Sequence, residues 1–185
     1  MNINTTYTKI ITGEDLMETA QHGSTLYPFQ FYYEDLSVFD FNCIEWHWHT
    51  ELEFIYIESG TVTLWIGEDQ FHLTEGNGIF INTKVLHRLY SPSKALIPNF
   101  VFMPSFIAPC DSLIYQKYIL PIISSSLPFL VFHKKVCWQA KVLSIIRQII
   151  SAQDSVLSKE LLTSSLLQNL WLEIFENTDI SYQEE

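Results

Sequence analysis

Two histidines and a glutamate are spaced in this chain as ligands for a metal ion or a small molecule. They are His47, His49 and Glu53, within the segment 47–60. In an extended strand successive side chains point to opposite faces, so positions separated by an even number share a face. If the segment is a strand, one face presents two imidazoles and a carboxylate. His87, further along the chain, is the candidate fourth member of the group.

Neutral imidazoles and carboxylates are suitable ligands for divalent metals. Three histidines and one glutamate leave two positions open on an octahedral ion such as iron(II), manganese or nickel, and zinc fits the same ligands in lower coordination. Two other interpretations stay open. The four side chains form a polar pocket that hydrogen-bonds an effector without a metal, or single histidines only pack beside Trp46 and Trp48.

Trp65 and Tyr56 are the aromatic candidates for ligand binding, because such rings stack on sugars or aromatic effectors. Ordinary core packing is the alternative interpretation for both rings. Cys43 shares the parity of His47, so it either lines the pocket or packs inertly. Three further histidines stand in contexts typical of the surface and are assigned no role: His22, His72 and His133.

The elements that must position these residues are those of a mainly β domain. Turn signals recur at short intervals between Ser59 and Ser93, as is typical of an all-β barrel or sandwich. The short strands between and after them must pair with one another to be stable, and we predict them at 61–66, 70–73, 78–81, 87–90 and 99–103. A small barrel has an interior wide enough for side chains and one small ligand.

The chain becomes helical in character after Pro104. Apolar spacing predicts a short helix around 113–119, interrupted by Pro121, then a helix over 134–152 and another that begins after Ser158. The last helix carries too many leucines for one contact surface. We expect one side to cover the barrel and the other to bind a second subunit.

The length of 185 residues suits a compact domain with a helical appendage. We predict a barrel over 1–108 and a dimerisation appendage over 109–180. A hydrophobic share of 48% excludes a disordered chain. The net charge of -11 opposes binding to nucleic acid by this chain itself. The sequence shows no secretory signal and no apolar run long enough to cross a membrane, and its cysteines are scattered, so we expect a cytoplasmic protein with free thiols.

Two segments resemble the signatures of the cupin superfamily: residues 47–60 match the first signature, and residues 76–87 match a degenerate second one. Three positions depart from the pattern. Phe41 stands where a glycine is usual, Thr83 replaces a proline and Ser91 replaces an asparagine. These positions shape turns, so the set of candidate ligands stays complete.

Within the cupins, residues 40–176 are similar to the N-terminal sensor domain of AraC-type transcription regulators. The resemblance implies a jelly-roll barrel that binds a small-molecule effector and helices that form a homodimer. It also implies a DNA-binding helix-turn-helix region beyond this chain. We therefore predict a non-enzymatic sensor domain built around the four candidate ligands, and a metal-dependent cupin enzyme, a dioxygenase or isomerase, is the alternative.

Overall fold

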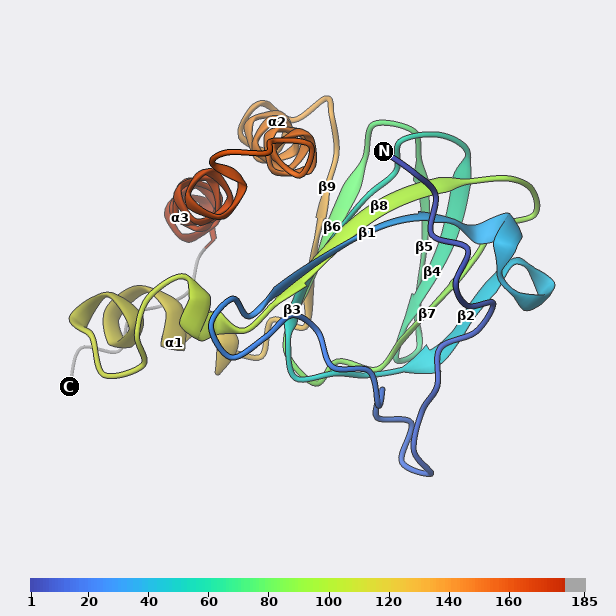
Figure 1. Cartoon of the computed structure of the whole chain (residues 1–185), viewed down its shortest axis with the longest axis horizontal. Coiled ribbons are helices and arrows are strands. Elements are labelled where there is room, and N and C mark those ends of the chain that lie inside the picture. The colour runs from blue at the N-terminus through green and yellow to red at the C-terminus, as the bar shows by residue number, and fades with distance from the viewer. Residues whose placement is uncertain (179–185) are drawn as a thin grey trace.

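A barrel of two facing antiparallel sheets, flanked by helices, forms the molecule (Figure 1). The computed structural model describes residues 1–178. The helices lie on the outer face of the larger sheet, and the smaller sheet closes the other side of the barrel. The predicted mainly β cupin jelly roll with C-terminal helices is confirmed. The last two residues of the predicted appendage, 179 and 180, lie outside the described residues.

Nine strands form the barrel, counted within the described part of the chain. The larger sheet has, in spatial order, β1 (Phe29–Asp35), β8 (Leu96–Phe102), β3 (Leu52–Tyr56), β6 (Gly78–Ile81) and β9 (Phe129–Phe132). The smaller sheet has β2 (Cys43–His47), β7 (His87–Tyr90), β4 (Thr61–Ile66) and β5 (Asp69–Thr74). Strand β9 was not expected from the sequence, because four apolar residues in a row are compatible with either a strand or a helix.

The predicted long helices are present as α2 (Cys137–Ala152) and α3 (Lys159–Asn177). Between β8 and β9 lie the short helices η3 (Pro104–Phe106), η4 (Tyr115–Ile119) and α1 (Leu120–Ile123), and before β2 lie η1 (Leu36–Val38) and η2 (Asp40–Asn42). Contrary to the prediction, Pro121 does not interrupt the helix. It sits in the first turn of α1, where the missing N–H needs no partner within the helix.

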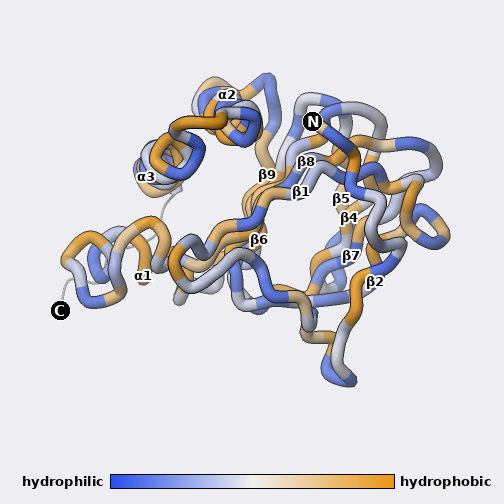
Figure 2. The backbone as a smooth tube through the Cα atoms, viewed as in Figure 1, coloured by the Kyte–Doolittle hydropathy of each residue, from blue (hydrophilic) through white to orange (hydrophobic). Residues whose placement is uncertain are grey.

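Strand β3 separates two hydrophobic cores, as its sequence parity predicts. Ile55 faces the inside of the barrel, together with the buried residues of the smaller sheet. Phe54 faces the other way and packs in the core shared with α2 and α3. Figure 2 shows the hydrophobic character of the chain around β6 and β9, beside the helices. The helices therefore bury one face of the larger sheet, and the barrel interior is a separate compartment.

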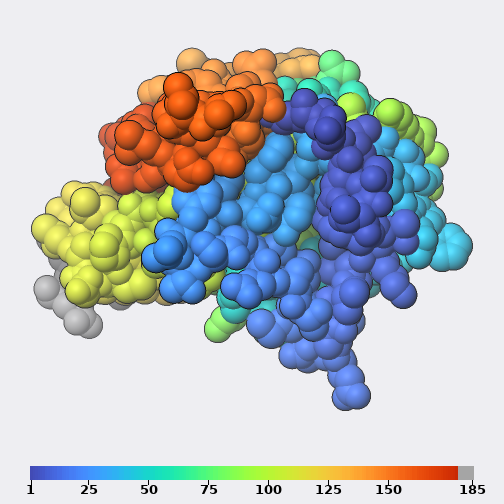
Figure 3. All heavy atoms as spheres, in the orientation of Figure 1, coloured from blue at the N-terminus to red at the C-terminus, as the bar shows by residue number. Residues whose placement is uncertain are grey.

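The N-terminal segment, residues 1–22, lies across the barrel (Figure 3). Its main chain is tied to Trp48: the Trp48 indole N–H donates to the carbonyl of Asp15 at 2.9 Å, and the Glu18 N–H donates to the carbonyl of Trp48 at 2.9 Å. These bonds place the segment next to the His-Trp-His sequence. Side chains from the segment thereby reach the interior of the barrel.

Candidate functional site

Three imidazoles converge inside the barrel. His47 ends β2 and His87 begins β7, and the antiparallel register of the two strands places these residues opposite each other. His49 follows two residues after His47, on the same side. One ring nitrogen from each histidine lies within 4.8 Å of the other two, and all three residues are buried. The distant His87 joins His47 and His49, as predicted. The segment 47–60 does not form the single strand that we expected, because β2 ends at His47 and β3 begins at Leu52 in the other sheet.

Glu53 reaches the same point from β3 in the opposite sheet. Its Oε2 lies 3.3 Å from Nε2 of His49 and 3.2 Å from Nε2 of His87. The carboxylate and the imidazoles are almost completely shielded from solvent. The four residues predicted as ligands are therefore brought together across the interior of the barrel.

Each histidine is oriented by a main-chain carbonyl that contacts its Nδ1 atom. The distances are 2.8 Å from His47 to Glu45, 3.1 Å from His49 to Glu51 and 2.9 Å from His87 to Val85. A carbonyl only accepts hydrogen bonds, so each Nδ1 carries the hydrogen. Nε2 is then free to act as a ligand in the neutral ring. Such outer contacts fix the tautomer and orientation of metal-binding histidines.

The charges in the cluster are strongly coupled. Burial lowers the pKa of His47 well below its ordinary value. Burial also acts to lower the pKa of His49, but its hydrogen bond with Glu53 outweighs that effect and raises the pKa. Burial acts to raise the pKa of Glu53, but its contacts with His49 and His87 dominate and lower the pKa. The contacts within the cluster therefore favour the ionised form of Glu53 and the protonated form of His49.

Two distances in the cluster fit a divalent metal ion shared by Glu53, His49 and His87. Ligand bonds of about 2.0–2.2 Å at angles of about 90–109° separate neighbouring ligand atoms by about 2.8–3.6 Å. The contacts of Glu53 with His49 and His87 fall in this interval. In the described part of the chain, Nε2 of His87 is buried without a hydrogen-bond partner. A neutral imidazole lone pair facing a carboxylate oxygen requires a proton or a metal cation between them.

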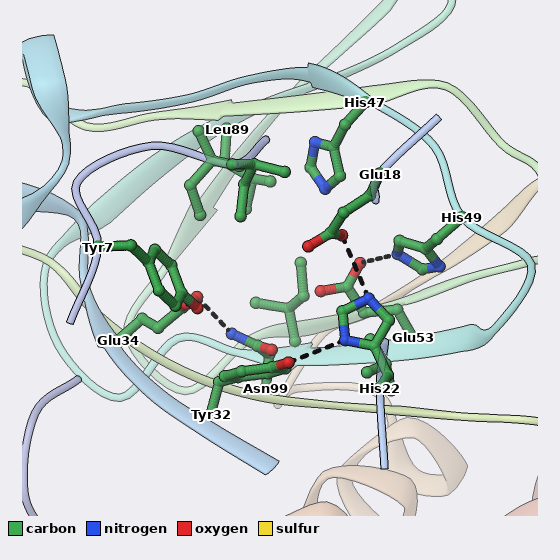
Figure 4. Close-up of a pocket in the computed structure, with 14 residues that line it drawn as sticks. Tyr7, Glu18, His22, Tyr32, Glu34, His47, His49, Glu53, Leu89 and Asn99 are labelled. Carbon is green, nitrogen blue, oxygen red and sulfur yellow. Dashed lines mark hydrogen bonds and ion pairs between the residues drawn. The ribbon is translucent and has the colours of Figure 1, made fainter. Parts of the chain in front are cut away.

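The cluster forms one end of a cavity of about 30 Å³. At this volume it has room for about two water molecules or an ion. The side chains that line it, shown in Figure 4, are Tyr7, Ile10, Glu18, His22, Tyr32, Glu34, Ile44, His47, His49, Glu53, Ile55, Leu89, Asn99 and Val101. An organic effector of ordinary size therefore needs part of this wall to move.

His22 is not on the surface, contrary to the sequence prediction. It is buried and lines the cavity, with Nδ1 2.8 Å from the Tyr32 hydroxyl and Nε2 3.3 Å from Oε2 of Glu18. The burial of His22 was not predictable from strand periodicity, because the N-terminal segment has no regular strand pattern. The Glu-x-x-x-His spacing was the one available signal. His72 and His133 are exposed, as predicted.

The aromatic candidates lie outside the cavity. Trp65 is on the outer face of the smaller sheet, where the Arg88 guanidinium lies 5.0 Å from the centre of its ring. Tyr56 packs against the core shared with the helices. Core packing is thus confirmed for Tyr56, and neither ring contacts the interior site.

Cys43 does not line the cavity either. The pairing between β2 and β7 shifts register between Ile44 and His47, as a β-bulge does. The shift reverses the parity of the residues before it, so Ile44 faces the cavity in place of Cys43.

Comparisons with known proteins agree with the fold. Residues 30–171 match the family described as the AraC-like ligand binding domain. The chain is 24% identical over 143 residues to the uncharacterized HTH-type transcriptional regulator YdeC of Bacillus subtilis, which covers 75% of this chain and 48% of YdeC. This chain thus spans about half the length of that relative.

Two structures of ToxT from Vibrio cholerae are similar to the chain in fold. One is 13% identical with a TM-score of 0.54 and covers 85% of this chain and 61% of ToxT. The other, an apo form, is 10% identical with a TM-score of 0.57. The match covers 90% of this chain and 62% of ToxT. Because the family match extends from β1 into α3 and includes all four candidate ligands, the chain belongs to the family of AraC-like ligand-binding domains.

Proposed function

We propose that this chain is the effector-sensing domain of a transcription regulator and that its sensor site is the interior cavity. The observation that carries this proposal is the convergence of His47, His49 and His87 on Glu53. Burying a polar group is costly unless it is hydrogen-bonded or paired, and among residues 1–178 Nε2 of His87 is buried without a hydrogen-bond partner. YdeC is named as an HTH-type regulator, so the proposed output is control of a DNA-binding module in the full-length protein.

A divalent metal is the proposed partner of the histidine cluster. His47, His49, Glu53 and His87 would hold the ion, with iron, manganese, nickel and zinc as the candidates that suit these ligands. Bound there, it would supply a Lewis-acidic attachment point for an effector oxygen or nitrogen. The residues of the N-terminal segment would close the cavity over the ligand.

The proposed mode of assembly is a homodimer through the C-terminal helices. Leu161 and Leu172 on α3 are 76% and 50% exposed. A groove of about 180 Å³ between η4 and α3 is lined mainly by apolar side chains, among them Ile114 and Trp171. Burying such a surface against a second copy of the chain would stabilise the pair.

The acidic chain is proposed to make no nucleic-acid contacts itself. Its proposed location is the cytoplasm. No helix among residues 1–178 could span a bilayer.

Elemental analysis combined with thermal unfolding tests the proposed site. We expect the purified domain to bind close to one equivalent of metal, and the ion to raise the unfolding midpoint because it binds only the folded state. His87→Ala should abolish both effects, while His72→Ala, which removes an exposed histidine, should leave them unchanged. Equal metal binding by the two variants would refute the site.

The enzyme alternative is tested on the same protein. A metal-dependent dioxygenase or isomerase would turn over a substrate, and His49→Ala would abolish that turnover. A sensor would instead bind its effector stoichiometrically, and in the full-length protein the effector would change DNA affinity. The coupling between effector and DNA must be reciprocal, so DNA should change effector affinity by the same factor.

A further inference from the structure

A second polar cluster lies at the other side of the cavity from His47 and His49 (Figure 4). The Tyr7 hydroxyl donates to Oε1 of Glu34 at 2.5 Å, and Nδ2 of Asn99 donates to Oε2 of Glu34 at 2.9 Å. Glu34 and Asn99 lie on the neighbouring strands β1 and β8, and Tyr7 comes from the N-terminal segment. The three side chains therefore form a polar patch on the cavity wall.

Glu34 differs from the other carboxylates of the cavity in its partners. Glu18 contacts the imidazole of His22, and Glu53 contacts two imidazoles of the histidine cluster. Glu34 is 4% exposed, and the hydrogen bonds described for its carboxylate come from two neutral donors. The residues that line the cavity include no lysine or arginine. A metal bound by the histidines would neutralise Glu53 and leave Glu34 without a counterion.

A carboxylate is an unfavourable choice for a purely structural contact at this position. Burying a charge without a counterion is costly, and burial raises the pKa of Glu34 to about 7. A glutamine would satisfy the same neighbours, because its oxygen accepts from Asn99 and its amide group donates to the Tyr7 oxygen. The negative charge is therefore better explained by something that enters the cavity.

We propose that the carboxylate of Glu34 is a subsite for a protonated amine, so that the effector carries a primary ammonium group. Tyr7 and Asn99 are its neutral neighbours, and each donates one hydrogen bond to it. This assignment rests on the proposed sensor function and adds the chemical class of the ligand. An ammonium group has three N–H donors, and each oxygen of Glu34 keeps a free lone pair beside the bond it already accepts. Charge-assisted hydrogen bonds of this kind are stronger than neutral ones.

Methylammonium is a suitable probe, because its two heavy atoms match a cavity of about 30 Å³, which has room for about two waters. We would measure thermal unfolding near pH 8 with methylammonium chloride, tetramethylammonium chloride or sodium chloride at equal ionic strength. Tetramethylammonium carries the same charge but is larger and has no N–H donor. We expect methylammonium alone to raise the midpoint, by about 2–4 °C near saturation.

Glu34→Gln should remove this rise, and Glu68→Gln, at an exposed position, should retain it. Tyr7→Phe keeps the carboxylate and removes one donor to it, so it should retain or increase the rise even if Glu34→Gln folds poorly. An unchanged rise in Glu34→Gln, its loss in Tyr7→Phe, or no rise in the wild type would overturn the assignment. If the amine proposal fails but a metal ion still raises the unfolding midpoint of Glu34→Gln, the proposed sensor site remains supported.

Discussion

Oε2 of Glu53 lies 3.2 Å from Nε2 of His87, and the two atoms belong to opposite sheets of the barrel. Nδ1 of His87 is engaged by the carbonyl of Val85 at 2.9 Å, which leaves Nε2 to face the carboxylate. A cation between these atoms joins the two sheets at one point. Protons and metal ions compete for that position, so metal binding must depend on pH.

Metal affinity should weaken as the pH falls. The ligands have to lose their protons to bind a metal, and Glu53 raises the pKa of His49, so this imidazole holds its proton more tightly than an ordinary histidine. Where metal binding releases one proton from the ligands, we expect the dissociation constant for Mn²⁺ or Zn²⁺ to increase about tenfold for each unit by which the pH falls. Calorimetric titrations between about pH 8 and pH 6 measure this change. A flat profile would place the metal on other ligands.

Glu34 should make the domain less stable as the pH rises. Burial raises its pKa from 4.5 to about 7, so between these values the folded state holds a proton that the unfolded state has released. Folding stability therefore falls with increasing pH across this window, by roughly 3 kcal/mol in total. The groups that face Glu34 are Tyr7 and Asn99, with the charges of Glu53 and Glu18 further away.

Denaturant unfolding of wild type and Glu34→Gln at several pH values measures this contribution. The variant has no proton to lose, so its stability relative to wild type should increase from about pH 5 to about pH 8. Glu68→Gln, an exposed position, is the matched control and should follow the wild type. Parallel curves for wild type and Glu34→Gln would contradict a raised pKa.

Phe41→Gly should stabilise the domain. Phe41 adopts φ 58° and ψ 22°, a left-handed conformation that costs a residue with a Cβ atom about 1–2 kcal/mol. Its side chain is 91% exposed, so little packing is lost. The greater freedom of glycine in the unfolded chain offsets part of the gain, and we expect a net increase of about 0.5–1 kcal/mol. Asn42→Gly at φ 54° should gain less, because asparagine tolerates this conformation better.

The same position shows a departure from the cupin pattern that the local structure makes understandable. Phe41 stands where that pattern usually has a glycine, and its backbone adopts a left-handed conformation that favours glycine. The strand parity of Glu53 and Ile55 was predictable, because one face of β3 is buried against helices and the other lines the barrel. At Glu53 and Ile55, the alternation of side chains along the strand therefore matches the two environments on either side of β3.

The rest of the site was not predictable, because it depends on contacts between distant segments. Tyr7 and His22 belong to a segment without periodicity, and main-chain bonds to Trp48 and neighbouring residues place it over the barrel. Ile44 replaces Cys43 in the cavity because of a bulge in β2, which a count of alternating residues cannot detect. Glu34 lies on an edge strand, where a carboxylate is ordinarily solvated.

Charge on the exposed face of α3 should prevent the proposed dimer. Leu161 and Leu172 lie on this helix and are 76% and 50% exposed, so a glutamate at either position adds charge without opening a cavity in the core. Sedimentation or light scattering should show a dimer for wild type and a monomer for Leu161→Glu or Leu172→Glu. Leu26→Glu is the control, because Leu26 is 96% exposed and precedes β1 in the chain, outside α3. A dimer that persists in both α3 variants would place the interface on another face, since a charge buried without a partner weakens an apolar contact strongly.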